Sequence, residues 1–315
     1  MSLEILEVNG LATLQDSGRT GWRKFGVPTS GAMDMFAFRA ANLLAGNDPH
    51  CAAVEIGLGG IVLRALHDCV VSVAGVGFAL SIYIWDFPLW SSYYARGGWT
   101  IRLDKLDFGV WAYLAISGGV QTPLALDSSS TYLRGAFGGL DGRRLQAGDV
   151  LRSGIPSRSL NELAARTLPE SARPAYSDNP TIDVVMGPQE KYFADDSAAT
   201  FLSQAYTISP TSDRMGYRLE GPALVHRDKV ELVSEGMTMG AIQVPANGQP
   251  IVMMADSPTT GGYPKIGTVV RADLPLLAQC APGKSRIRFR RTTVAQAQEK
   301  ARRLMGRLGR SIEAE

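Results

Sequence analysis

The stretch GAIQVPANGQPIVMMADSPTTGGYPKIGTVVRAD, residues 240–273, shows how this chain is built. Short β-branched runs at residues 241–244 and 251–254 predict two strands, and the run at 268–271 predicts a third. The segment SPTTGGYPK, residues 257–265, separates the second strand from the third and predicts a loop displayed at the end of a sheet. The sequence therefore indicates a β-rich fold that presents polar groups from its loops.

The loop at 257–265 carries groups suited to a small polar ligand. Thr259 and Thr260 offer hydroxyl groups, Lys265 offers a cation, and Gly261 and Gly262 allow positive φ angles and a close approach of the backbone. We expect these residues to bind an anionic or strongly polar small molecule. The alternative interpretation is a turn whose glycines and prolines only connect two strands.

Other parts of the chain repeat the pattern of short apolar runs interrupted by Gly, Pro or Asp. Further strands are predicted at residues 61–66, 69–74, 78–84, 99–103, 111–116, 182–186, 230–233 and 287–290. Such short, closely spaced strands favour a barrel or a sandwich over βαβ units.

Helical periodicity is confined to a few places. Apolar residues recur at three- and four-residue spacing over 31–45, with Ser30 as the expected N-cap. A second helix is predicted from Pro188, with a break near Asp195. At the C-terminus, residues 293–315 predict a basic amphipathic helix, which either docks a partner or packs on its own domain.

A chain of 315 residues more often forms two domains than one, and Pro, Ser, Ala and Arg accumulate between residues 155 and 180. We expect an N-terminal β-barrel domain at 1–155, a linker at 156–180, a second β-barrel domain at 181–292 and the terminal helix. The segments DSGRTGW (16–22) and SDRMGY (212–217) are alike, and each is followed by a Glu and a Gly beside an apolar strand. A duplicated barrel unit explains this similarity, although a match this short can also arise by chance.

Charge and cysteine content exclude several classes of function. There are 32 Lys and Arg against 30 Asp and Glu, a net charge of +2, so neither a nucleic acid nor a membrane is an evident partner. No apolar run reaches the roughly 18 residues of a membrane helix, and the N-terminus lacks a signal-peptide pattern. The three cysteines form no C-x-x-C pair, which indicates a reducing compartment. We therefore expect a cytoplasmic protein.

The sequence lacks the familiar catalytic motifs. It contains no G-x-x-x-x-G-K-[ST] phosphate loop and no G-x-S-x-G elbow, and its histidines show no metal-ligand spacing, so no metal site is predicted. Two Gly-rich segments, TLQDSGR (13–19) and GVPTSGAMD (26–34), carry the polar candidates Asp16, Arg19, Ser30, Gly31 and Asp34. Carboxylates beside a fixed arginine either serve in acid–base chemistry or hold a loop closed.

A further Gly-rich segment, STYLRGAFGG at residues 130–139, adds Arg134 to the candidates. An arginine there either captures a carboxylate or phosphate or ties its loop to the barrel.

Seven segments in the same order resemble one family: LATLQDSGRTGWRKFGVPTSGAMD, AANLLAGN, STYLRGAFGG, GRRLQAGDVL, SDRMGYRLEGPAL, SEGMTMGAIQVPANGQPIV and TTGGYPKIGTVVRADLPLLAQ. The chain is identified as a member of the KipA-type family, also called the C subunit of the bacterial ATP-dependent 5-oxoprolinase. It is also similar to the second half of the carboxyltransferase domain of urea carboxylase. The resemblance implies a mainly β fold of tandem cyclophilin-like β-barrel domains with a few peripheral helices.

The resemblance also implies partners and an activity. A KipI-like protein and a LamB/YcsF-like protein are expected to join this chain as the other two components of the enzyme, and the chain is expected to be inactive alone. The complex would open the lactam ring of 5-oxo-L-proline to L-glutamate while hydrolysing ATP. ATP with Mg is expected at the level of the complex, and no cofactor is expected to be bound covalently.

If the chain is an enzyme subunit, Asp16, Asp34 and Glu235 are the acid–base candidates. The expected substrate-binding residues are Arg19, Ser30, Gly31, Arg134, Arg214, Gln243, Thr259, Thr260, Gly261, Gly262, Tyr263 and Lys265. The family usually has Asn where this chain has Asp213, beside Arg214, which puts the preference for an anionic substrate in doubt.

Two alternatives to the 5-oxoprolinase role stay open. One is the carboxyltransferase component of a biotin-dependent urea or amide carboxylase. The chain lacks a Met-Lys-Met biotin-carrier motif, so that group would come from another chain. The other alternative is a non-catalytic regulatory protein that binds a KipI-like inhibitor of a sensor kinase.

Overall fold

The structure, a computed structural model, describes residues 1–227 and 232–313. The chain divides into two compact units. The first contains Met1–Arg19, Ser30–Arg173 and the end of the chain from Met305. The second contains Thr20–Thr29 and Pro174–Leu304. A short segment of the N-terminal half thus belongs to the second unit.

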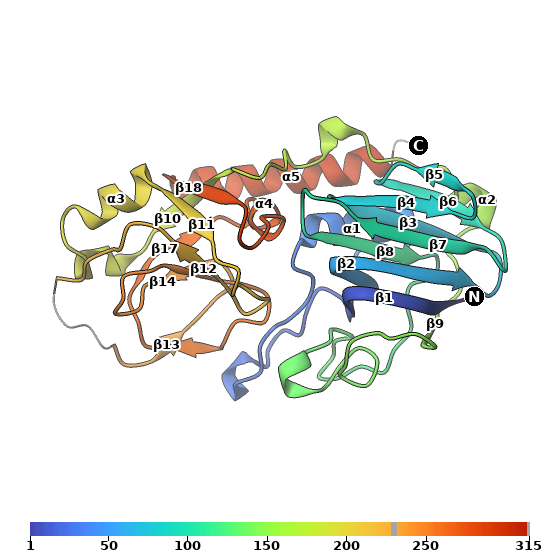
Figure 1. Cartoon of the computed structure of the whole chain (residues 1–315), viewed down its shortest axis with the longest axis horizontal. Coiled ribbons are helices and arrows are strands. Elements are labelled where there is room, and N and C mark those ends of the chain that lie inside the picture. The colour runs from blue at the N-terminus through green and yellow to red at the C-terminus, as the bar shows by residue number, and fades with distance from the viewer. Residues whose placement is uncertain (228–231, 314–315) are drawn as a thin grey trace. The chain divides into compact units, whose positions relative to one another are not determined.

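The first unit is built on one large sheet, to which the described residues contribute nine strands. The strands are β1 (Ser2–Gln15), β2 (Ala53–Ala65), β3 (Cys69–Gly75), β4 (Phe78–Ile82), β5 (Trp85–Phe87), β6 (Ser91–Ala95), β7 (Thr100–Lys105), β8 (Trp111–Ile116) and β9 (Val150–Arg152). Their order is β5-β4-β7-β2-β8-β3-β6, and β1 pairs with both β2 and β9. The sheet forms a half-barrel, visible in blue and green in Figure 1.

The long strands β1 and β2 form an antiparallel pair that extends from Leu3 opposite Ala65 to Gln15 opposite Ala53. Two register shifts interrupt the pairing, and at the second shift the backbones of the two strands approach each other very closely. A Cβ atom on Gly59 would lie 1.3 Å from the carbonyl oxygen of Asn9, so only glycine fits there. The sequence analysis did not predict β1, because polar residues and Gly10 interrupt its pattern.

Helix α1 (Met35–Leu44) covers β3 and β8 on one face of this sheet. Both strands are buried along their whole length, since the helix closes one face and the sheet core the other. The predicted helix is confirmed, but the predicted N-cap was wrong. The side chain of Asp34 accepts the N–H groups of Phe36 and Ala37, whereas Ser30 precedes the helix with a φ of 55°.

Short helical turns follow β8: η2 (Leu133–Gly135) lies between β8 and β9, and α2 (Leu160–Leu163) and η3 (Glu170–Ala172) come after β9. The predicted linker at 156–180 remains a prediction. Within it, Leu163 and Ala172 are buried, and the division between the two units falls after Arg173.

The second unit is a closed barrel of β10 (Thr181–Met186), β11 (Ala205–Ile208), β12 (Gly216–Glu220), β14 (Ala241–Gln243), β15 (Ile251–Met253), β17 (Lys265–Val269) and β18 (Arg286–Arg291). The order around the barrel is β10-β17-β14-β15-β12-β11-β18, and β10 and β18 close it as a parallel pair. Every second residue of these strands is apolar and points into the barrel. Phe289 of β18 stacks on Phe201 of the helix α3 (Ser197–Ser203), with ring centres 4.3 Å apart.

Short elements surround this barrel. They are η4 (Pro188–Tyr192), α3 (Ser197–Ser203), α4 (Leu274–Ala278) and a two-stranded ladder of β13 (Glu235–Gly236) and β16 (Thr260–Gly261). The helical region predicted from Pro188 is confirmed, with its break before Ser197. Of the strand predicted at 230–233, residues 230 and 231 lie outside the described residues, and residues 232 and 233 are not in a strand.

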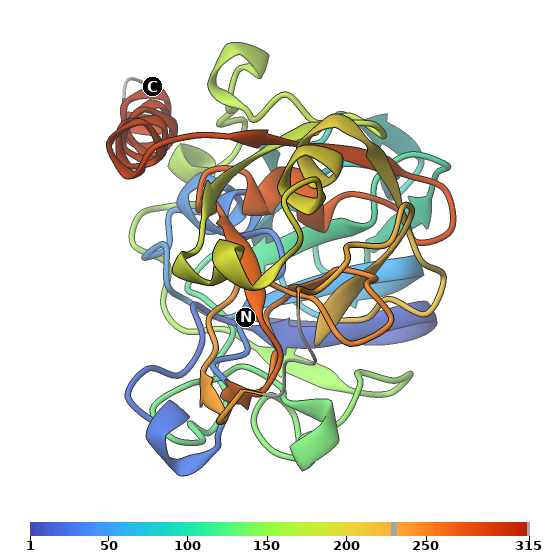
Figure 2. The ribbon, with the colours of Figure 1, turned by 90° about the vertical axis from the view of Figure 1, so that its left-hand side faces the viewer.

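The C-terminal helix α5 (Val294–Glu313) is confirmed and is seen nearly along its axis in Figure 2. Its first half belongs to the second unit, where Lys300 lies 2.6 Å from both Asp183 and Asp273. Burial raises the pKa of Asp273. Burial acts in the same direction on Asp183, but the hydrogen bonds from Arg290 and Lys300 outweigh it and lower the pKa of that carboxyl group. No helix among the described residues combines the length and apolar character needed to cross a membrane.

The predicted fold class is confirmed, since the chain is mainly β with a half-barrel, a closed barrel and few helices. Most predicted strands are present within a few residues of the predicted ends, and β8 has the bounds expected for it. The strands not predicted are β1, β5, β6, β9, β11, β12, β13 and β16.

Candidate functional site

In the first unit, Asp16 stands at the centre of a hydrogen-bond cluster. Its carboxylate accepts the N–H of Gly18 at 2.7 Å and the N–H of Ser129 at 2.6 Å. It also accepts the hydroxyl groups of Ser128 and Ser130. We call Asp16, Gly18 and Ser128 to Ser130 the Asp16 cluster. Four donors on one carboxylate tie the loop after β1 to the loop at 128–130.

The neighbouring predicted residues complete this structure. Arg19 is fully buried, donates to the carbonyl of Ser130 and lies 4.8 Å from the ring centre of Phe137. A Cβ on Gly31, whose φ is 87°, would lie 2.9 Å from the backbone nitrogen of Gly18, so glycine is required where these two loops meet. Asp16, Arg19 and Gly31 therefore lie together, and Asp16 and Arg19 both bind Ser130.

Asp34 belongs to a different buried group in the same unit. Its backbone N–H donates to the hydroxyl of Tyr113 at 2.7 Å, and that hydroxyl donates to Glu55 at 2.7 Å. Glu55 also accepts the N–H of Met33 at 2.8 Å. Burial, and then the charges of Glu55 and Asp34, raise the pKa of Tyr113 well above its usual value. Tyr113 thus stays protonated and fixes the start of α1.

Beside the Asp16 cluster lies an open cavity of about 880 Å³. Its lining includes Asp16, Ser129, His50 and Arg152, so it offers charges of both signs to a small molecule. Arg134, in contrast, lies exposed on the turn η2 and does not line this cavity.

In the second unit, Lys265 and Glu235 form an ion pair with Nζ 3.1 Å from Oε2. Gln189 joins them, since its Nε2 donates to Glu235 Oε1 and its Oε1 accepts the backbone N–H of Lys265 at 2.7 Å. We call Lys265, Gln189 and Glu235 the Lys265 fork. The hydrogen bond from Lys265, followed by its charge and the bond from Gln189, lowers the pKa of Glu235 despite some opposing burial.

The loop at 257–265 continues directly into this fork. The short ladder pairs Glu235 with Gly261 and Gly236 with Thr260. The carbonyl of Thr259 accepts the N–H of Met237 at 2.9 Å. Figure 1 places β13 at the edge of the second unit.

The expectation of positive φ angles at Gly261 and Gly262 was wrong, because neither residue adopts one. Their lack of a side chain serves packing instead. A Cβ on Gly261 would lie 3.1 Å from Met237 Sδ and 3.3 Å from Gln243 Nε2. Gln243 is buried on β14, where it pairs in register with Lys265, and Tyr263 is 42% exposed.

Arg23 is a further cation at this loop. It belongs to the segment Thr20–Thr29 of the second unit, and its Nη2 donates to the carbonyls of Met237 at 2.6 Å and Pro258 at 2.9 Å. Burial lowers the pKa of its guanidinium. Among the arginines of the N-terminal segments, the sequence analysis selected Arg19 and missed Arg23.

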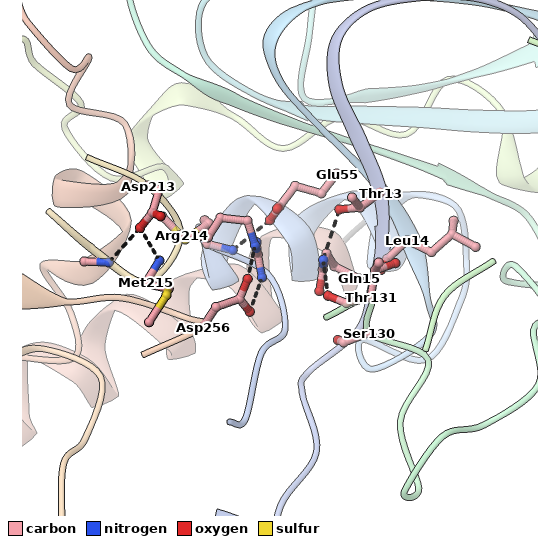
Figure 3. A network of polar contacts seen from close by, with 12 residues as sticks. Thr13, Leu14, Gln15, Glu55, Ser130, Thr131, Asp213, Arg214, Met215 and Asp256 are labelled. Carbon is pink, nitrogen blue, oxygen red and sulfur yellow. Dashed lines mark hydrogen bonds and ion pairs between the residues drawn. The ribbon is translucent and has the colours of Figure 1, made fainter. Parts of the chain in front are cut away.

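Arg214 forms a buried ion pair with Asp256, shown in Figure 3. Its Nε lies 2.9 Å from Oδ2 and its Nη2 3.0 Å from Oδ1, and the two side chains are 7% and 8% exposed. The carboxylate of Asp213 accepts the N–H groups of Met215 and Gly216 through Oδ1. An asparagine has an oxygen at the same place, so this departure from the family pattern preserves the turn.

Each unit thus gathers part of the predicted set. The first brings together Asp16, Arg19 and Gly31, and the second Glu235, Gln243, Lys265 and the loop from Thr259 to Gly262. The sequence analysis missed Gln189, Asp256, Glu55 and Tyr113 as members of these groups. Asp256 stands next to the selected loop, but Gln189 carries no signal, because it lies 76 residues from Lys265.

The described residues, 1–227 and 232–313, contain no group of three or more His, Cys, Asp or Glu side chains arranged to hold a metal ion. The acidic candidates Asp16, Asp34 and Glu235 are engaged by serine hydroxyls, backbone N–H groups, Gln189 and Lys265.

The half-barrel and the closed barrel belong to a known class of protein. The family model described as "Carboxyltransferase domain, subdomain A and B" matches residues 25–291, and the chain belongs to this family.

Within this family, the chain is similar over nearly its whole length to two C subunits of 5-oxoprolinase. The chain is 38% identical to the C subunit of 5-oxoprolinase from Haemophilus influenzae, over 94% of this chain and 93% of that protein. It is 37% identical to the Escherichia coli protein of the same name, over 90% and 89%. The predicted resemblance to the 5-oxoprolinase C subunits is confirmed.

Among solved structures, the urea amidolyase of K. lactis superposes with a TM-score of 0.90 at 27% identity. The match covers 97% of this chain and 20% of the amidolyase chain, so this chain spans one fifth of that protein.

Proposed function

We propose that this chain is the C subunit of a multi-subunit, ATP-dependent 5-oxoprolinase, which opens the ring of 5-oxo-L-proline to L-glutamate. The observation that carries the proposal is the match to the 5-oxoprolinase C subunits, which extends over nearly the whole length of both chains. By contrast, urea amidolyase matches only through one fifth of its length.

The chemistry of the described site supports this proposal. The substrate is a small carboxylate, and phosphorylation of its lactam oxygen would create negative charge next to the ring. The second unit offers the cations Lys265 and Arg23 around the loop at 257–265. In this scheme Lys265 binds an anionic group, and Asp16 and Asp34 hold the loops of the first unit.

The complex would also contain a KipI-like protein and a LamB/YcsF-like protein as its other two components. ATP and its Mg²⁺ would bind at the level of the complex. The three free cysteines fit a reducing compartment, and we place the complex in the cytoplasm.

The test is reconstitution of the complex from its three purified proteins. The lone chain should show no 5-oxoproline-dependent ATP hydrolysis, and the complex should release phosphate and glutamate together. Full activity of the lone chain, or none in the complex, would contradict the proposal.

A second candidate is the carboxyltransferase component of a biotin-dependent urea or amide carboxylase. The family match and the fold shared with urea amidolyase favour it. The same assay distinguishes the two candidates when urea and bicarbonate replace 5-oxoproline and a biotinylated carrier protein is supplied.

A further inference from the structure

The Lys265 fork presents two hydrogen-bond donors to one carboxylate. Lys265 Nζ approaches Glu235 Oε2 at 3.1 Å, and Gln189 Nε2 donates to Glu235 Oε1. The orientation of the Gln189 amide is fixed, because its oxygen accepts the backbone N–H of Lys265 at 2.7 Å. Two donors on separate oxygens of one carboxylate form a bidentate site.

The donors are better anchored than the carboxylate that they hold. Lys265 extends from a strand of the closed barrel and its side chain is 19% exposed. Glu235 lies on the two-residue strand β13 and its side chain is 45% exposed. An ion pair exposed to this extent contributes little to stability, so another anion can replace the carboxylate at small cost.

We propose that Lys265 and Gln189 form the binding site for the carboxylate of a small-molecule substrate, and that Glu235 occupies this site until the substrate displaces it. The inference rests on the proposed function, whose substrate carries one carboxylate beside its lactam. It assigns a role to Gln189 and makes Glu235 an internal competitor.

Displacement has a second consequence for Glu235. The hydrogen bond from Lys265 is the main cause of the lowered pKa of this carboxyl group. Once that bond goes to the substrate, Glu235 regains its usual proton affinity beside the bound ligand. A released carboxylate is better suited to accept a proton than one held by a lysine.

The test is a titration of the full-length lone chain with 5-oxo-L-proline and with acetate, followed by calorimetry or by the NMR signal of the Gln189 side-chain amide. Removal of the competitor in Glu235→Gln and Glu235→Ala should lower Kd about fivefold for both ligands. Lys265→Met should abolish binding, and Gln189→Leu should weaken it.

Matched controls are available within the chain and among ligands. Glu299 is also 45% exposed and ion-paired, with Arg302 and Arg303, so Glu299→Gln should leave Kd unchanged. Lys191→Met removes one positive charge near Gln189 and should also have no effect. 2-Pyrrolidinone has the lactam but no carboxylate, and it should gain nothing from Glu235→Gln.

The proposal is overturned if Glu235→Gln binds the carboxylates no better than the original chain. It is also overturned if pyrrolidinone shows the same gain, or if no variant binds a carboxylate. These outcomes are distinct from failure of the proposed function, because the titration needs neither ATP nor partners. If the complex is active but Glu235→Gln does not change carboxylate binding, only the proposed role of the Lys265 fork is rejected, and the proposed function stands.

Discussion

The Asp16 cluster and the Lys265 fork use the same kind of group in opposite ways. The Asp16 carboxylate accepts four hydrogen bonds from two loops and holds these loops together. Glu235 receives two donors and remains 45% exposed. A carboxylate that accepts four hydrogen bonds from its own chain cannot easily exchange partners, whereas a half-exposed one that accepts two can. The comparison indicates that the first polar group shapes the loops and that the second is able to bind ligand.

If engagement by the chain's own groups decides this difference, the buried and doubly hydrogen-bonded pair of Arg214 and Asp256 should also have a structural role. Asp256→Ala leaves Arg214 buried without its carboxylate, and we expect a loss of about 4 kcal/mol in the free energy of unfolding. Urea denaturation monitored by circular dichroism measures this loss.

The control is the exposed pair of Glu4 and Arg64, where Glu4→Ala should cost less than about 1 kcal/mol. The double variant Arg214→Met with Asp256→Leu should recover most of the lost stability. Equal small losses for Asp256→Ala and Glu4→Ala would show that burial does not separate ties from exchangeable pairs.

Asp16 tests the first side of the comparison directly. Asp16→Ala removes the acceptor of four hydrogen bonds, and we expect a loss of about 3 kcal/mol in the free energy of unfolding. Asp16→Asn keeps one oxygen and should cost about half as much. Urea midpoints of the three proteins measure both values, and an unchanged midpoint for Asp16→Ala would contradict a structural role.

Substitution of Tyr113 should cause a smaller loss in the free energy of unfolding, and this loss should depend on pH. Tyr113→Phe deprives Glu55 and the Asp34 N–H of their shared hydroxyl, at a cost of about 2 kcal/mol. Because the folded pKa is raised, this contribution is fully present below the unfolded value near ~10 and is lost as pH rises through the folded pKa.

Stability curves between pH 8 and 11 check this sign. Above about pH 10 the free energy of unfolding should fall less steeply with pH in Tyr113→Phe than in the original chain. The difference between the two slopes corresponds to at most one proton. Tyr206→Phe should change the alkaline slope in the same direction over this range, because burial raises the pKa of Tyr206 to about 12. A variant with an unaltered alkaline slope would mean that Tyr113 is not held protonated.

The parts of the fold that the sequence predicted have strong local patterns. The strand at 111–116 and the helix over 31–45 are both apolar enough to be recognised without their neighbours. β1 was missed because its two register shifts depend on pairing with β2. Likewise, local sequence favoured Ser30 as the cap, whereas Asp34 accepts the helix N–H groups.

The candidate site was predictable to the extent that its residues share one segment. The loop from Thr259 to Lys265 was found from its own composition, and Glu235 from the repeated motif. Gln189 was missed because only barrel closure brings it to Lys265. Arg19 was preferred to Arg23, and the structure places Arg19 fully buried against Phe137.

The smallest effect belongs to Glu235 and tests the exchangeable side of the comparison. The lowered pKa means that its contribution to stability is present above the unfolded pKa and is lost as pH falls through the folded value. Since the side chain is half-exposed, solvent and salt screen that contribution. Glu235→Gln should therefore leave the urea midpoint at pH 7 within error of the original chain, in low and in high salt. If Glu235→Gln lowered the urea midpoint as far as Asp16→Ala does, Glu235 would be required for the stability of the fold. A ligand could then not displace its carboxylate from Lys265 at small cost.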